Sequence, residues 1–205
     1  MFGFVMLPQV IKSTLLSLLV ITTFALSNVV SAEQALFTEQ VCLLSIKLDT
    51  KPTNKNQMLN FDDNIHMQLT NSVAIKERKS ARIASNITCQ QLTGASYTGS
   101  DEEWVKFFDS AFQGMLKANF KDIQFTLVGE ADKIFKPDFV NDYMVKEYFF
   151  NADAGGNKQI IKNLALLDKA NNSVYTFSVS GNEIVEAEII EEFNRLVASI
   201  KKVAE

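Results

Sequence analysis

The sequence predicts an α+β domain in which an antiparallel β-sheet meander is flanked by two amphipathic helices. Apolar residues recur at helical spacing in two segments, over residues 101–118 and 183–203. Between these segments lie four strand-like runs, separated by turn signals. Most of the connections are short, whereas a parallel pair needs a crossover of a dozen residues or more. Consecutive runs are therefore expected to pair antiparallel.

Both helices carry terminal signals. Ser100 and Glu103 fit a capping box at the start of the first helix, which then presents a broad aromatic stripe containing Trp104, the one tryptophan in the chain. Acidic residues crowd the start of the second helix and basic residues lie near its end. That order of charges complements the helix dipole.

The strand-like runs cover residues 123–128, 143–150, 160–167 and 175–179, with turns at 153–157 and 168–173 and a break at 180–182. A further strand is expected upstream of the first helix, over residues 82–92. The start of the chain is less clear. Residues 41–48 fit either a strand or the end of a helix that begins near Gln34. Residues 51–57 (KPTNKNQ) are expected to form a loop, and residues 58–79 are left unassigned.

The order strand, helix, four-strand meander, helix resembles the PsbP/Mog1-like α-β-α sandwich. The segments that carry this resemblance are EEWVKFFDSAFQGMLKANFKDIQFTLV, where a helix leads into a strand, and NSVYTFSVSGNEIVEAEIIEEFNRLVASIKK, where the last strand leads into the closing helix. The resemblance covers about residues 82–202 and rests on element order. It implies a non-enzymatic binding or assembly role, without naming a partner or a catalytic residue.

Adjacent aromatic residues mark a candidate interaction surface. Phe149 and Phe150 follow one another in a predicted strand, so they face opposite sides of the sheet. Either both faces are covered, or one ring is left exposed for a partner. The candidate ligand-binding or partner-binding residues are Phe149, Phe150, Tyr143 and Asp138, the last of which lies in the connection over residues 132–141.

The first 32 residues are expected to be a signal peptide. Residues 14–30 carry no charge, Lys12 precedes them, and Val30-Ser31-Ala32 provides small residues for cleavage. An uncleaved signal anchor is the alternative, because an apolar run of this length is near the lower limit for a membrane-spanning helix. With cleavage, residues 33–205 form a single exported domain, periplasmic or secreted, that has no further association with the membrane.

Charge and cysteine content restrict the function. Without Lys12 the mature chain has 19 basic and 24 acidic side chains, a net charge of −5, which argues against binding to nucleic acid. Cys42 and Cys89 are the only cysteines, and in an oxidising compartment they are expected to form a disulfide; two buried free thiols are the alternative. These cysteines and the single histidine, His66, lack the ligand spacing of a zinc site, so no metal and no cofactor is expected.

Two functional hypotheses remain. The first is a non-enzymatic domain that binds a protein partner or a small apolar ligand, because the chain contains no phosphate-binding loop and no nucleophile elbow. The alternative is a small secreted hydrolase that uses His66 with the nearby carboxylates of Asp62 and Asp63, or with a free cysteine.

Overall fold

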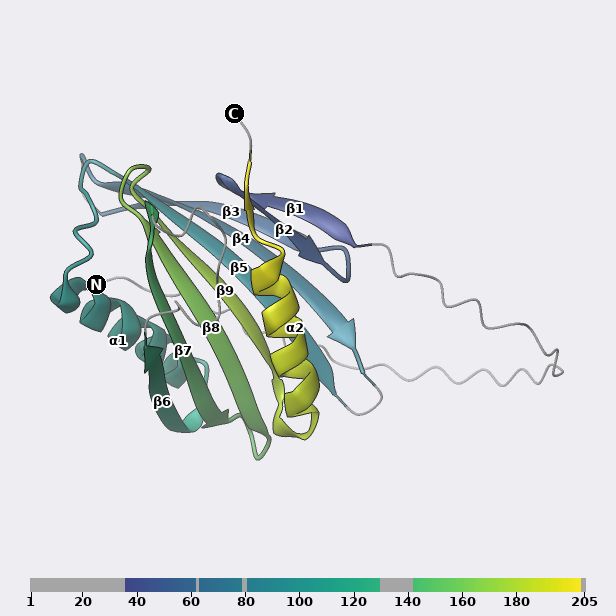
Figure 1. Cartoon of the computed structure of the whole chain (residues 1–205). Helices are drawn as coiled ribbons and strands as arrows, with labels where there is room; N and C mark the ends of the chain where they lie inside the picture. The colour runs from purple at the N-terminus through teal and green to yellow at the C-terminus, as the bar shows by residue number, and fades with distance from the viewer. Residues whose placement is uncertain (1–35, 62, 79–80, 130–141, 204–205) are drawn as a thin grey trace, which may run out of the picture.

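The computed structural model describes residues 36–61, 63–78, 81–129 and 142–203. The expected signal peptide (residues 1–32), Asp62 and Asp138 lie outside these ranges. Within them the chain is mostly β, with two antiparallel sheets and two α-helices (Figure 1).

The larger sheet has seven strands in the order β3-β4-β5-β9-β8-β7-β6, and all neighbours are antiparallel. It joins two meanders, β3-β4-β5 and β6-β7-β8-β9, through the pairing of β5 with β9. Its edge strands are therefore β3 and β6. The strands are β3 (Thr53–Asn60), β4 (His66–Glu77), β5 (Arg82–Thr93), β6 (Lys121–Gly129), β7 (Met144–Asp153), β8 (Lys158–Asp168) and β9 (Ser173–Asn182).

The smaller sheet consists of β1 (Phe37–Val41), β2 (Leu44–Leu48) and the short β10 (Lys201–Lys202), with β2 in the middle. A two-residue turn, Cys42-Leu43, joins β1 to β2. Cys42 has a φ of 53°, in the left-handed region that normally favours glycine. Its sulfur is bonded to Cys89 of β5, so the disulfide fixes this turn against the large sheet. The predicted disulfide is confirmed.

The two faces of the large sheet carry separate apolar cores. Strand side chains alternate between faces, so Phe177 contributes to one core and Val174 to the other. On the first face, here the α2 face, pack α2 (Glu186–Ala198) and the small sheet. On the second, the α1 face, α1 (Asp101–Lys117) packs against β7 and β8. Figure 1 shows the two helices on opposite sides of the sheet. Burial of each large apolar side chain contributes about 1.5–3 kcal/mol.

The capping box of α1 is present. The hydroxyl of Ser100 accepts a hydrogen bond from the backbone N–H of Glu103 at 3.3 Å. The carboxylate of Glu103 in turn accepts from the N–H groups of Gly99 at 2.6 Å and Thr98 at 2.9 Å. These bonds fix the entry of the chain into the helix, so the first turn places Trp104 in the core of the α1 face.

The predicted α-β-α sandwich is wrong, although the element order predicted for residues 82–202 is confirmed. The sequence prediction took the sheet from the second half of the chain. The first half adds β3 and β4 to that sheet and builds a second sheet from β1 and β2. Because α2 shares its face with the small sheet, that side of the large sheet is covered by a helix together with a second sheet, and the described residues form a two-sheet, mostly β structure.

Three local predictions are corrected as well. Residues 51–57 include the start of edge strand β3, which tolerates Pro52 just before it and polar side chains along it. Residues 37–48 form a strand hairpin, so the alternative of a helix starting near Gln34 is wrong. The break expected at residues 180–182 is absent from β9. Gly181 pairs within this strand, and the position requires a glycine because an added Cβ would lie 2.8 Å from the carbonyl oxygen of Arg82.

Candidate functional site

The predicted binding residues do not gather in one place. Phe150 is 3% exposed on the α1 face, where its ring centroid lies 5.4 Å from that of Phe125 and 5.8 Å from that of Tyr148. Phe149 is half-buried on the α2 face, with Lys162 Nζ 5.8 Å from its ring centroid. Tyr143 is buried in the core of the α2 face. Phe150 and Tyr143 therefore lack an open surface through which to touch a ligand.

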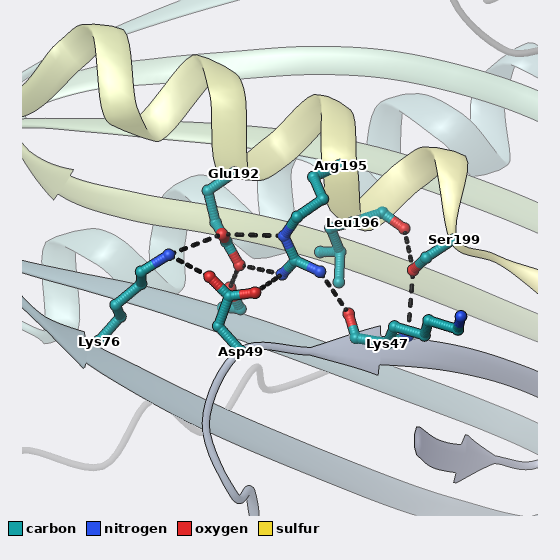
Figure 2. Close-up of polar contacts among 8 residues, drawn as sticks. Lys47, Asp49, Lys76, Glu192, Arg195, Leu196 and Ser199 are labelled. Carbon is teal, nitrogen blue, oxygen red and sulfur yellow. Dashed lines mark hydrogen bonds and ion pairs between the residues drawn. The ribbon is translucent and has the colours of Figure 1, made fainter. Parts of the chain in front are cut away.

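Four charged side chains meet between α2, the end of β2 and β4 (Figure 2). Arg195 donates two hydrogen bonds to the carboxylate of Glu192, from Nη2 at 2.5 Å and from Nε at 3.2 Å. Its Nη2 also lies 3.2 Å from Oδ1 of Asp49. Lys76 forms an ion pair with Asp49 and lies 3.8 Å from Glu192. Ser85 of β5 donates a further hydrogen bond to Glu192 at 3.2 Å. We call Asp49, Lys76, Glu192 and Arg195 the ion-pair cluster.

The ion-pair cluster connects elements and leaves no group free for chemistry. Its two positive and two negative charges balance, and every member has a partner of opposite sign. Burial raises the pKa of Asp49, but the hydrogen bond from Lys76 and the charges of Arg195 and Lys76 outweigh it and hold this pKa below its ordinary value. Asp49 therefore stays ionised at neutral pH. The ion-pair cluster therefore holds α2 against β4 and the end of β2.

Hydrogen bonds extend these contacts along α2 to the small sheet. Arg195 also donates to the carbonyl oxygen of Lys47 at 3.0 Å, and the N–H of Lys47 donates to the hydroxyl of Ser199 at 3.0 Å (Figure 2). The Ser199 hydroxyl donates in turn to the carbonyl oxygen of Leu196 at 2.7 Å. One edge of α2 is thus held to β2 by polar contacts with both main chain and side chains.

His66 lies at the start of β4 and has no carboxylate neighbour in the contacts described. Its Nδ1 lies 3.0 Å from the amide oxygen of Asn60. The imidazole lines a shallow depression of about 410 Å³ whose lining carries no charged carboxylate: Met58, Asn60, His66, Gln68, Gln91 and Thr93. Both cysteines are bonded to each other, so neither supplies a thiol. Among the described residues, His66 is therefore not brought together with Asp63 or with a free thiol, and Asp62 lies outside the described ranges.

Metal-ligand groups and membrane-spanning helices are both absent from the described part of the chain. It contains no group of three or more His, Cys, Asp or Glu side chains that could hold a metal ion. Neither of its helices combines the length and apolar character needed to cross a bilayer.

The most exposed apolar strand is β6. Phe125 is 41% exposed, Leu127 is 45% exposed and Val128 is 47% exposed. No other strand in the described ranges exposes three large apolar side chains. β6 is also an edge of the large sheet, visible as the dark green outermost strand beside α1 in Figure 1. We call Phe125, Leu127 and Val128 the β6 patch.

The β6 patch rests on a rigid aromatic base. The ring of Phe125 lies 5.1 Å from that of Phe108 of α1 and 6.0 Å from that of Tyr148 of β7, centroid to centroid. Phe125 is therefore held from below by these rings while 41% of it stays exposed. Sequence reasoning selected the neighbouring strand through Phe149 and Phe150. The signal it missed was the absence of any charge from Ile123 to Gly129 in a strand at the edge.

Comparisons with known proteins place the chain only loosely. No protein-family model and no curated protein matches it. Among solved structures, it is similar to LpqN, described as involved in cell envelope biogenesis of Mycobacterium tuberculosis. The TM-score is 0.42 and the identity 6%, over 75% of this chain and 86% of that chain. The resemblance to the PsbP/Mog1-like group gains no support from a family model, and a similarity this low says nothing about function.

Proposed function

We propose that the protein is an exported, non-enzymatic protein, periplasmic or secreted, that binds a protein partner through the β6 patch. The observation that carries this proposal is the exposure of three large apolar side chains within four residues of an edge strand. Contiguous exposed apolar surface of this kind marks interaction sites in soluble proteins. Its aromatic base keeps the surface pre-organised, which lowers the entropic cost of binding.

Export is supported by two independent features. Disulfides persist in oxidising compartments, and the Cys42–Cys89 bridge is part of this fold. The apolar, charge-free run over residues 14–30 has the composition expected of a leader.

A protein partner fits the β6 patch better than a small apolar ligand does. Small-ligand sites are concave and enclose most of the ligand surface. The depression around His66 contains no member of the β6 patch. Nor does a second depression of about 510 Å³ between the end of α1 and the β7–β8 turn. An open strand edge is instead suited to a flat protein surface or an added strand.

The test is site-specific photo-crosslinking in the native host. A photo-reactive amino acid is placed at Leu127 in the full chain and, as a matched control, at Ile75 of β4, which is 51% exposed. We expect a discrete covalent adduct from position 127 and none from position 75. Equal adducts from both positions, or none from 127, would overturn the proposal.

A further inference from the structure

We infer that the partner of β6 is a second copy of this chain, joined by antiparallel pairing of the two β6 strands about a two-fold axis. This inference rests on the proposed function above and names its partner. The result is a sheet that continues from one protomer into the other.

The first argument is the open backbone of β6. Within the described ranges it is paired with β7 on one side only, so no described strand bonds the alternate N–H and C=O groups on its other side. Irregularities between Lys121 and Gln124 and between Leu127 and Gly129 bound a regular stretch of four residues, Gln124 to Leu127. This stretch is where a second strand can add by main-chain hydrogen bonds.

The second argument is that the pattern of β6 is self-complementary. Phe125 and Leu127 face the α1 side, because they pair with Phe150 and Tyr148, and they alternate with Gln124 and Thr126. In an antiparallel pair with both α1 helices on one side, residues that face each other share a face of the sheet. Phe125 and Leu127 then meet apolar residues, and Thr126 meets either Gln124, with the axis at Phe125, or its own copy, with the axis at Thr126. The two-fold axis must therefore pass through Phe125 or Thr126. A shift of the register by one residue would place every side chain of the second strand on the opposite face of the sheet.

The third argument is charge. The described charges of β6 are Lys121 and Asp122, both at its start. Antiparallel pairing places these two ends at opposite extremes of the interface, so no like charges meet. Parallel pairing would bring Lys121 beside its own copy, which is unfavourable. The sequence of the strand thus favours its own antiparallel copy.

The first test compares single lysine substitutions on the two edges of the sheet. Thr126→Lys places a charge at the centre of the inferred interface, and Asn56→Lys places the same charge on β3; both positions are exposed. Molar mass is measured by sedimentation equilibrium on the exported full chain. We expect a dimer for the wild type and for Asn56→Lys, and a dissociation constant raised at least about tenfold for Thr126→Lys. A monomeric wild type, or a Thr126→Lys dimer as tight as the wild type, overturns the inference.

The second test locates the axis. Cysteine introduced at Phe125 or Thr126 is expected to form a covalent dimer at whichever position lies on the two-fold axis, while Asn56→Cys forms none. Covalent dimers from Asn56→Cys in equal amount would contradict β6 pairing.

The photo-crosslinking experiment separates failure of this inference from failure of the proposed function. An adduct of twice the chain mass from Leu127 agrees with a second copy. A heterologous adduct from Leu127, with a monomeric wild type, keeps the proposed function and eliminates the dimer. Absence of any adduct eliminates both.

Discussion

The two edges of the seven-stranded sheet differ in composition although their positions are equivalent. β3 reads TNKNQMLN and presents asparagine, threonine and Lys55 to solvent, with Met58 as its single exposed large apolar side chain. β6 reads KDIQFTLVG and presents the β6 patch. A charged, polar edge prevents pairing with other chains, and an apolar edge invites it. The difference agrees with the proposal that a partner binds at β6 and not at β3.

The halves of the sheet behind these edges are also held differently. Behind β3, the small sheet is attached through the Cys42–Cys89 disulfide, and α2 is attached through the ion-pair cluster. Behind β6, α1 is attached through edge-to-face ring contacts, among them those of Phe107 and Phe108 with Tyr148 of β7. An apolar core lies behind both edges, and the half with the polar edge has covalent and ionic contacts in addition. Four predictions test this division.

Phe150→Ala is expected to lower the free energy of unfolding most. Its ring is fully enclosed by the aromatic base of β6, and removing a buried phenylalanine costs about 3–5 kcal/mol. Phe149→Ala, one residue away on the other face and half-buried, should cost about 1 kcal/mol. Urea unfolding monitored by circular dichroism measures both. Similar losses for the two variants would contradict the separate burial of these rings.

Removal of the disulfide by Cys42→Ala with Cys89→Ala should cost about 2–4 kcal/mol, because it frees a loop with a sequence separation of 47 residues. Hydrogen exchange should increase in β1 and β2 and stay nearly unchanged in β6 to β8. Uniformly faster exchange throughout the large sheet would show that the halves are not held independently. Wild-type protein in reductant is the matched control.

Asp49→Asn should destabilise the fold by about 1–2 kcal/mol at neutral pH, because it removes a partner from Lys76 and Arg195. The pKa of Asp49 is lowered in the folded state, so its contribution is present above the ordinary value of 3.8 and is lost as the pH falls below it through the folded pKa. Unfolding curves taken at several pH values should therefore converge for variant and wild type in acid. A difference that persists unchanged there would exclude the ion pairs as its cause.

Glu147→Gln should change the free energy of unfolding least, and it should increase it where the other substitutions decrease it. Glu147 of β7 is buried, its Oε2 has no hydrogen-bond partner, and burial raises its pKa although Lys162 opposes the shift. A raised folded pKa means that stability is highest below the ordinary value of 4.5 and decreases as the pH rises through the folded pKa. The variant should be more stable than the wild type by about 1 kcal/mol at neutral pH. Thermal unfolding at pH 4 and pH 7 checks the sign, with Asp49→Asn as the comparison.

The features that were predicted correctly depend on short sequence patterns or on residue content. The capping box at Ser100, the meander from residue 121 to 182 and the disulfide follow from patterns within short windows or from residue counting. The two-sheet architecture could not be found this way, because β3 and β4 are partly polar and their pairing with β5 depends on the rest of the sheet. The same limit applied to the candidate site: Phe125 is exposed only because β6 is an edge strand, which no local pattern reveals.

The pairing of β5 with β9 has a consequence for how the chain matures. If the chain is exported as we propose, both cysteines, which lie in its first half, emerge from a translocation channel before β9 does. The early strands β3 to β5 and the hairpin of β1 and β2 can be locked covalently at that stage. Until β9 arrives, β5 is itself a free edge. The order of emergence thus makes the amino-terminal half a template on which the carboxy-terminal meander is completed.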